Sequence, residues 1–224
     1  MKTAFRIRVL RFSSAAVAVL ASATAYAQPI SPITIIDGGY SEYCSLAAHN
    51  PEHLPNVLIT GTRLPLSPIR VCTLAIEAGT ERVNRAANHN NRGVLHFETG
   101  NLDAALADFE EAIRRDERLV FAHINRGNIF IRREQWEQAI SAFDRAIELG
   151  IDPEADRLVE VAESDEPGEG AAIPEMARVH FNRGIAHEYL EQLREAYLDY
   201  RRASELAPDW DVPRQEMDRF EVVR

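Results

Sequence analysis

The sequence predicts an all-α protein made of a helical hairpin that recurs along the chain, and three observations carry this prediction. The tripeptide Asn-Arg-Gly occurs three times, and its first two occurrences, at Asn91 and Asn125, are 34 residues apart. After each tripeptide, small and aromatic residues return at offsets that place them on one face of a helix. Apolar residues make up 46% of the chain, which is enough for a packed core between such helices.

Charge and cysteine content exclude several other classes of protein. The 224 residues include 25 Lys and Arg against 35 Asp and Glu, which gives a net charge of −10. Nucleic acids and anionic membranes reward clustered basic residues, so we expect neither as a partner. No apolar run reaches the roughly 20 residues that a membrane-spanning helix needs. Two cysteines are too few for a small fold held together by disulfides.

Residues 1–27 have the three parts of a secretory signal peptide. Four basic residues and no acidic one accompany a short apolar stretch, and Ala25-Tyr26-Ala27 forms a small-residue cleavage site before Gln28. The apolar stretch is too short for a membrane anchor. We therefore expect a periplasmic or secreted protein whose mature chain begins at Gln28.

Export decides how the two cysteines, Cys44 and Cys72, are interpreted. In an oxidising compartment a disulfide is the default, and it would close a loop of about 28 residues, worth about 3 kcal/mol in the chain-entropy model. The alternative is a metal site with His49 and His53, but the spacing matches no standard zinc pattern. We predict a disulfide within an N-terminal arm and degenerate helical hairpin over residues 28–85.

The three copies of the repeat occupy residues 86–119, 120–153 and 177–210. Each has a glycine in the middle of its first helix, where glycine costs about 1 kcal/mol relative to alanine, so the sequence indicates a close helix contact at Gly93, Gly127 and Gly184. Twelve, sixteen and nineteen residues later come Ala, an aromatic residue and Ala on one face of a second helix. These residues are Ala105, Phe109 and Ala112, then Ala139, Phe143 and Ala146, then Ala196, Tyr200 and Ala203.

This pattern resembles the tetratricopeptide repeat family, whose unit is a 34-residue helical hairpin with the same glycine, alanine and aromatic spacing. The resemblance implies a right-handed α-solenoid of stacked hairpins. The sequence departs from the family at two places in every copy. Histidine replaces an early aromatic residue, and arginine replaces the leucine before the glycine; these residues are His89, His123, His180, Arg92, Arg126 and Arg183.

The unusual histidines and arginines have structural interpretations. We interpret the histidines, together with His96 and His187, as packing residues with a polar tip; a ligand-binding or pH-sensing cluster is the alternative. By their offsets, Arg92 is expected to pair with Asp108, and Arg183 with Asp199. In the second copy Ala142 stands at that place, so Arg126 needs another partner such as Asp144.

The family resemblance also implies a binding surface, because the first helix of each repeat lines the concave face of the solenoid. The residues expected on this face are Asn91, Asn125, Asn182, Asn90, Asn128, Arg132 and Arg178. Some of them resemble a clamp that grips a peptide's C-terminus in family members, although Asn90 stands where that clamp has lysine. Side-chain amides can instead hydrogen-bond between helices inside the solenoid, and this alternative stays open.

Two further segments flank the third repeat. Residues 154–176 form an acidic insertion, interpreted as a solvated linker with a docking arm as the alternative. Residues 211–224 are predicted to form a C-terminal capping helix that turns Met217 and Phe220 toward the core.

The sequence favours binding over catalysis. It contains no glycine-rich phosphate loop, no G-x-S-x-G elbow and no H-E-x-x-H pair, so we predict no enzymatic activity, no cofactor and no metal. The first hypothesis is an exported scaffold that binds a protein or peptide in the cell envelope. The alternative is a structural or assembly factor of the envelope that self-associates into a homo-oligomer.

Overall fold

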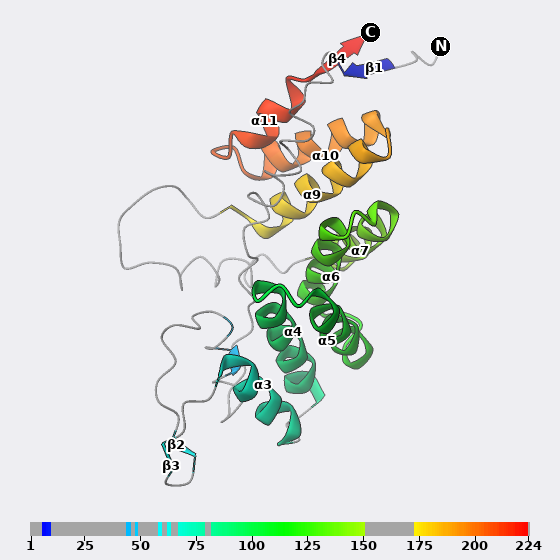
Figure 1. The fold of residues 1–224 in the computed structure, drawn as a ribbon. Helices are drawn as coiled ribbons and strands as arrows, with labels where there is room; N and C mark the ends of the chain where they lie inside the picture. The colour runs from blue at the N-terminus through cyan, green and yellow to red at the C-terminus, as the bar shows by residue number, and fades with distance from the viewer. Residues whose placement is uncertain are drawn as a thin grey trace. The chain divides into compact units, whose positions relative to one another are not determined.

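A computed structural model of the chain describes residues 6–9, 44–45, 48, 58–59, 62–63, 67–78, 82–150 and 173–223 (Figure 1). Its helices are α3 (Pro68–Glu77), α4 (Arg82–Glu98), α5 (Leu102–Arg115), α6 (Val120–Arg132), α7 (Trp136–Leu149), α9 (Glu175–Tyr189), α10 (Leu193–Leu206) and α11 (Val212–Met217). Most of the predicted signal peptide and all but the end of the acidic insertion lie outside the described residues. Each predicted repeat contains two helices: α4 and α5 in the first, α6 and α7 in the second, and α9 and α10 in the third.

The described residues form two compact units, and the boundary between them lies inside α6, between Ile129 and Phe130. The N-terminal unit contains α3, α4, α5 and α6 up to Ile129, with the short strands β2 (Leu58–Ile59) and β3 (Thr62–Arg63). The C-terminal unit contains the rest of α6, α7, α9, α10 and α11, with the strands β1 (Arg6–Val9) and β4 (Phe220–Val223).

In the N-terminal unit, α4 packs against both α3 and α5. The turn between α4 and α5 is made by Gly100, whose φ of 78° lies in the left-handed region that glycine adopts without strain. Asn101 then caps α5, because its Oδ1 accepts a hydrogen bond from the backbone N–H of Ala104 at 3.3 Å. Gly100 and Asn101 together therefore end α4 and begin α5.

The two other repeat turns use a different residue at the left-handed position. Glu134 follows α6 with a φ of 57°, and Glu191 follows α9 with a φ of 58°. Unlike glycine, glutamate has a Cβ atom, which makes this left-handed conformation unfavourable. The hairpins therefore share one turn geometry, but only the first has the residue best suited to it.

The repeat glycines allow the close packing that the sequence indicates. A Cβ on Gly93 would lie 2.6 Å from a ring carbon of Phe109, and a Cβ on Gly184 would lie 2.8 Å from a ring carbon of Tyr200. Both rings are almost wholly buried, so neither has room to move away. The prediction that no side chain fits between the paired helices is confirmed for these two repeats.

Each unit has its own apolar core around the aromatic residue of its hairpin. In the N-terminal unit Phe109 packs with Val94, Ala105 and Ile129. In the C-terminal unit, α9 and α10 lie side by side (Figure 1) and enclose Phe181, Ile185, Ala196, Tyr200 and Ala203. The remaining predicted packing residues, Ala112, Ala139, Phe143 and Ala146, are fully buried as well.

The degenerate hairpin contributes α3 to the N-terminal unit. Ser67 caps this helix by accepting a hydrogen bond from the backbone N–H of Arg70 at 3.3 Å. Cys72 on α3 packs with Cys44, Ala48, Ala75 and Leu95 in a small apolar cluster. The two cysteine sulfur atoms lie 2.15 Å apart, and the two Cα atoms lie 4.5 Å apart.

The C-terminal cap is shorter than the helix predicted for residues 211–224. The helix α11 ends at Met217, and Phe220–Val223 form the strand β4 instead. Two β-branched residues, Val222 and Val223, favour an extended backbone there. The prediction that Met217 and Phe220 face the core is confirmed, because both pack against the cluster around Tyr200.

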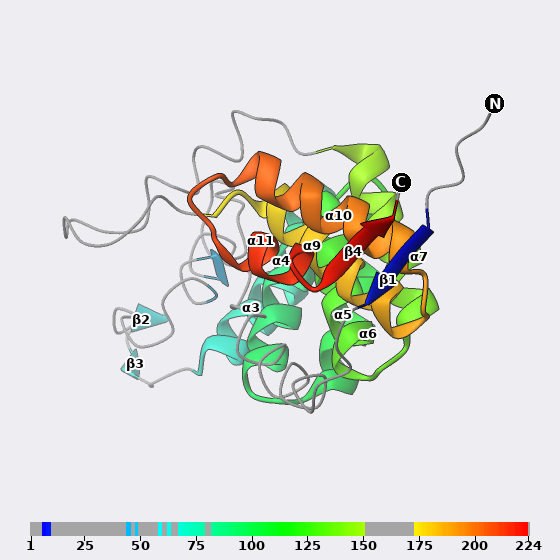
Figure 2. The same cartoon turned by 90° about the horizontal axis from the view of Figure 1, so that it is seen from above.

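The strand β4 pairs with β1, which lies within the predicted signal peptide. The pairing is antiparallel and matches Arg6 with Val223 and Val9 with Phe220. Figure 1 and Figure 2 both show the two strands side by side at one end of the C-terminal unit. The strand β1 also lies against α10.

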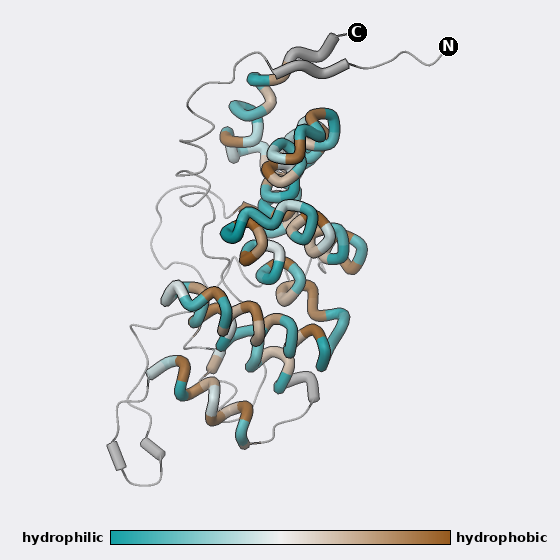
Figure 3. Tube along the Cα trace, turned by 45° about the vertical axis from the view of Figure 1, so that its right-hand side comes forward, coloured by the Kyte–Doolittle hydropathy of each residue, from teal (hydrophilic) through white to brown (hydrophobic). Residues whose placement is uncertain are grey.

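The helices are amphipathic. Figure 3 shows hydrophobic and hydrophilic segments alternating along most of the helices, as expected when one face packs and the other meets water. Within the described ranges, no helix is both long enough and apolar enough to cross a bilayer.

Candidate partner-binding surface

The asparagines predicted to line a concave binding face are buried. Asn90, Asn91, Asn125, Asn128 and Asn182 are between 1% and 9% exposed. Asn125 on α6 donates a hydrogen bond from Nδ2 to Oδ1 of Asn90 on α4 at 2.9 Å. Nδ2 of Asn90 in turn lies 3.5 Å from Oδ1 of Asn91, the next residue of α4. The hydrogen bond between Asn125 and Asn90 therefore connects α6 to α4, and these buried amides do not form an exposed row of contacts for a partner.

The two predicted arginines differ from the asparagines. Arg132, the last residue of α6, is exposed. Arg178 on α9 is partly buried, and its Nε lies 3.3 Å from Oε2 of Glu175 one turn earlier. The predicted surface is thus corrected: of its seven residues, Arg132 is exposed, Arg178 is partly buried, and the five amides are inside.

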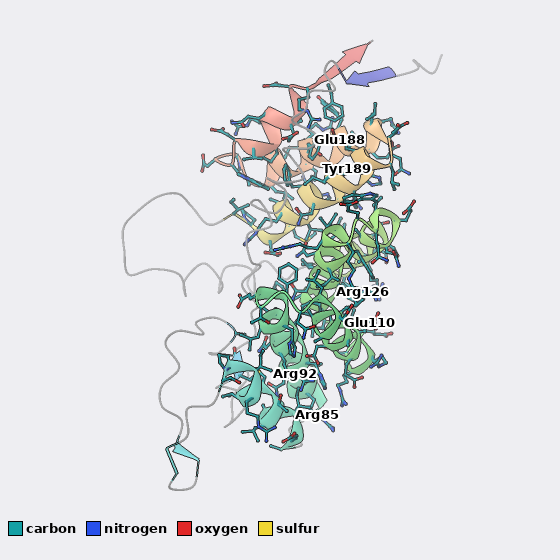
Figure 4. All side chains as sticks on the ribbon, in the orientation of Figure 1. Arg85, Arg92, Glu110, Arg126, Glu188 and Tyr189 are labelled. Atoms are coloured by element: carbon teal, nitrogen blue, oxygen red, sulfur yellow. A yellow bond between two sulfur atoms is a disulfide. The ribbon has the colours of Figure 1, made fainter. Side chains whose placement is uncertain are left out.

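The first hairpin holds a buried carboxylate that several basic groups surround. Arg92 on α4 makes a bidentate contact with Asp108 on α5, with Nε 2.8 Å from Oδ2 and Nη2 2.7 Å from Oδ1 (Figure 4 labels Arg92). Nδ1 of His89 lies 3.0 Å from Oδ1 of the same carboxylate, and Nε2 of His96 lies 4.0 Å from Oδ2. The predicted ion pair is confirmed, and two histidines are added to it.

The third hairpin repeats this arrangement. Arg183 on α9 places Nε 2.8 Å from Oδ2 and Nη2 2.7 Å from Oδ1 of Asp199 on α10. Nδ1 of His180 lies 2.9 Å from Oδ1, and Nε2 of His187 lies 3.8 Å from Oδ2. The second predicted ion pair is therefore confirmed with the same geometry.

The charges of these groups explain the pKa of each carboxylate. Burial alone would raise the pKa of Asp108, but hydrogen bonds from Arg92 and His89 outweigh burial and hold the pKa below its ordinary 3.8. The pKa of Asp199 is lowered in the same way, by His180 and Arg183. Both side chains stay ionised at neutral pH as the anionic centres of compact clusters.

Each cluster arginine also reaches the preceding helix of its unit. Nη1 of Arg92 donates to the hydroxyl of Thr73 on α3 at 3.2 Å. Nη1 of Arg183 lies 2.6 Å from Oδ1 of Asp144 on α7. The arginine thus holds three helices, because two nitrogens bind inside the hairpin and the third binds outside it.

The predicted partner of Arg126 is wrong, because Asp144 pairs with Arg183. Arg126 faces Glu110 on α5 instead (Figure 4), and Glu110 stands at the same repeat position as Asp144. Burial lowers the pKa of Arg126, and the charge of Glu110 opposes that effect. Glu110 and Asp144 are 34 residues apart, so the repeat itself carried the signal that these positions are equivalent.

Two further contacts were not predicted from the sequence. The rings of Trp136 on α7 and Tyr189 on α9 are stacked, with centroids 4.1 Å apart and planes within 3° of each other. Glu188, beside Tyr189 on α9 (Figure 4), accepts a hydrogen bond from the hydroxyl of Tyr200 at 2.9 Å and forms an ion pair with Arg219. These contacts attach α9 to α7 and to the C-terminal cap.

The clusters give structural rather than catalytic chemistry. Their polar groups bind one another over short distances, and each carboxylate is about 93% or more buried. In the part of the chain that the structure describes, no group of three or more His, Cys, Asp or Glu residues is arranged to hold a metal ion. Contacts with the carboxylates of Asp108 and Asp199 now explain four of the residues that depart from the repeat pattern: His89, Arg92, His180 and Arg183.

Two sequence profiles described as tetratricopeptide repeat match the chain. One matches residues 76–120 and 90–156, and the other matches residues 177–210. Together these matches span more than half of the sequence. A human protein named tetratricopeptide repeat protein 6 is 38% identical over 64 residues, which are 29% of this chain and 12% of that protein. The chain therefore corresponds to a small part of that relative's length.

Two solved structures are similar in fold. The crystal structure of YrrB, described as a TPR protein with an unusual peptide-binding site, has a TM-score of 0.52 and 21% identity over 66% of this chain and 63% of that chain. A MamA double mutant has a TM-score of 0.53 and 13% identity over 80% of this chain and 82% of that chain. The predicted fold class, an all-α solenoid of helical hairpins, is confirmed. The chain belongs to the tetratricopeptide repeat family.

Proposed function

We propose that this chain is an exported scaffold that binds a protein or peptide partner in the cell envelope. The observation that carries the proposal is the set of tetratricopeptide hairpins, a fold that supports an interaction scaffold rather than an enzyme. YrrB, which has this fold, is described as having a peptide-binding site. The acidic net charge of −10 favours a partner with basic or neutral contact residues.

Export is the part of the proposal that rests on the first 27 residues. Their basic, apolar and small-residue segments support cleavage after Ala27, and the close approach of the Cys44 and Cys72 sulfur atoms supports a disulfide in an oxidising compartment. N-terminal sequencing of the protein from its native cells should begin at Gln28, and its intact mass should rise on reduction. A chain that still begins at Met1 would contradict export.

The binding surface must use side chains that a partner can reach. The buried amides do not meet this condition, whereas Arg132 at the exposed end of a first helix does. We therefore test the surface with Arg132→Glu, which reverses one charge on α6. Arg145→Glu is the matched control, because Arg145 lies on α7, the second helix of the same repeat, and its side chain is 43% exposed.

The experiment is capture from a cell-envelope extract with the mature chain as bait, followed by measurement of affinity for the recovered protein. A partner that binds the wild type and Arg145→Glu equally, but binds Arg132→Glu with a several-fold different affinity, supports the proposal. Equal binding by both variants would contradict a binding surface formed by the first helices of the repeats. Recovery of the bait alone, with a mass that rises with concentration in light scattering, would favour the alternative of a self-associating assembly factor.

A further inference from the structure

The C-terminal strand β4 is held firmly at its first residue. The ring of Phe220 is buried, and its centroid lies 6.0 Å from the ring centroids of both Tyr197 and Tyr200. The residue before it, Arg219, forms ion pairs with Glu188 on α9 and Glu216 on α11. These contacts fix where β4 starts and in which direction it leaves the core of the C-terminal unit.

One edge of β4 carries an extended segment from the other end of the sequence. The strand β1, Arg6–Val9, pairs with it in antiparallel register, with Arg8 opposite Glu221 and Ile7 opposite Val222 (Figure 2). The segment has the sequence Arg-Ile-Arg-Val, which alternates basic and β-branched residues. Its backbone occupies donors and acceptors of β4 that would otherwise form an unpaired strand edge.

We propose that β4 is a strand-docking edge, which in the mature protein accepts an extended partner segment of alternating basic and β-branched residues in place of β1. This inference rests on the proposed function, because cleavage after Ala27 removes β1 and leaves the edge open. An open edge of known direction adds a strand through main-chain hydrogen bonds, and the side chains of the added strand select the partner.

Charge strengthens the preference for a basic strand. Residues 1–27 contain four basic and no acidic residues, so the mature chain is more acidic than the full chain with its net charge of −10. The other described strands do not offer a comparable edge, because β2 and β3 are two residues each and pair with one another. The docking edge is therefore assigned to β4, next to α10.

The test uses the chain from Gln28 to Arg224 and a fluorescein-labelled peptide of residues 3–12 as the added strand. Fluorescence anisotropy at physiological salt should show saturable binding. A peptide with both Ile7→Pro and Arg8→Pro should bind about tenfold more weakly or worse, because one of two adjacent residues always directs its N–H toward the neighbouring strand. A scrambled peptide of the same composition controls for attraction by charge alone.

A shortened chain that ends at Phe220 provides the matched protein control. It keeps the buried ring and the Arg219 ion pairs but lacks most of β4, and circular dichroism checks that it remains helical. The inference predicts that this chain loses binding of the wild-type peptide. It is overturned if the shortened chain binds equally well, if the scrambled or double-proline peptide binds as tightly as the wild type, or if the full mature chain shows no saturable binding.

The result is distinct from the outcome for the proposed function. Sequencing that finds an intact Met1 would contradict export, while the peptide experiment would still report on the β4 edge of a chain made without residues 1–27. Conversely, a failure of peptide binding would remove the docking edge and leave capture through the first-helix surface unaffected.

Discussion

The ion-pair clusters of the first and third hairpins have nearly the same interatomic distances. They differ in the contact that each arginine makes with the preceding helix. Within each hairpin, arginine binds aspartate through Nε at 2.8 Å and Nη2 at 2.7 Å, and a histidine completes the contact. Outside it, Arg92 meets the neutral hydroxyl of Thr73, whereas Arg183 meets the carboxylate of Asp144. The repeat therefore sets the contacts inside a hairpin, and the preceding helix sets the contact between neighbours.

The largest expected effect comes from removing the buried carboxylates. Asp108→Ala leaves Arg92 and His89 without their shared anion, and breaking such a buried pair costs about 3–5 kcal/mol of unfolding free energy. Asp199→Ala should cost less, because Arg183 keeps Asp144. Urea unfolding followed by circular dichroism measures both, with Asp108→Asn and Asp199→Asn as controls that keep the shape. Equal losses in the two hairpins would contradict the role given to Asp144.

The glycine contacts allow the packing of the first and third hairpins to be compared. Gly93→Ala and Gly184→Ala would each drive a Cβ into a buried ring, and overpacking of this kind costs about 1–3 kcal/mol, partly offset by the better helix propensity of alanine. Gly93→Ala should be the more damaging, because its Cβ would approach Phe109 more closely than that of Gly184→Ala approaches Tyr200. Thermal unfolding checks the order. A gain in stability from either change would show that the ring moves aside.

The contacts outside the hairpins should differ in their response to salt. Asp144→Asn removes a charge from a carboxylate that is 48% exposed, so we expect a loss of about 0.5–1 kcal/mol that shrinks as sodium chloride is added. Thr73→Val removes a neutral hydroxyl from Arg92, and its loss of similar size should not depend on salt. Urea unfolding at low and high salt distinguishes them, and the same salt dependence in both variants would remove the distinction.

The turns offer a smaller effect. Glu191 holds the left-handed conformation that Gly100 supplies in the first hairpin, so Glu191→Gly should stabilise the protein by about 0.5 kcal/mol after the added flexibility of the unfolded chain is subtracted. The reverse change, Gly100→Glu, should destabilise it. Thermal melting of the pair gives the answer, and a loss of stability in Glu191→Gly would mean that the side chain makes a contact worth more than the strain.

The smallest effect concerns pH and the first cluster. Burial lowers the pKa of His96 below its ordinary 6.5, although the charge of Asp108 opposes this. The unfolded chain therefore takes up that proton at higher pH than the folded chain, so the contribution of His96 is complete above pH 6.5 and decreases as the pH falls toward the folded pKa.

The cluster carboxylates titrate in a lower window. Their lowered pKa values mean that their contribution is complete above the ordinary value of 3.8 and is lost only at more acid pH.

Unfolding free energies measured between about pH 7.5 and 5.5 should fall less steeply for His96→Gln than for the wild type. Identical slopes would exclude His96 as the source.

Prediction from the sequence worked where one repeat unit decides the contact. The paired helices, the glycine contacts and the two Arg–Asp pairs depend on offsets within a hairpin, so the same residues in register were enough to find them. His89 and His180 were also placed on the packing face, although their hydrogen bonds to the carboxylates were not foreseen.

Prediction failed where the contact depends on neighbouring elements. The family resemblance places the asparagines on first helices, but it does not tell how much of each helix is covered. Helix α4 packs against α3 and α5 and receives Asn125 from α6, so consecutive residues from Ala86 to Asn91 are all buried. The partner of Arg126 lies in the preceding repeat, and β1 and β4 come from opposite ends of the sequence, so offsets within one hairpin cannot specify either contact.

The ion pair between Arg183 and Asp144 has a consequence for changes made in the connection between α7 and α9. Together with the Trp136–Tyr189 stack, it attaches α9 to α7 across the 23 extra residues that separate the last two repeats. Alignment of α9 on α7 thus comes from these side chains and not from the length of the connection. We therefore expect α7 and α9 to stay together when an epitope or a protease site is inserted between Gly150 and Ile173, because the same stack and ion pair hold them.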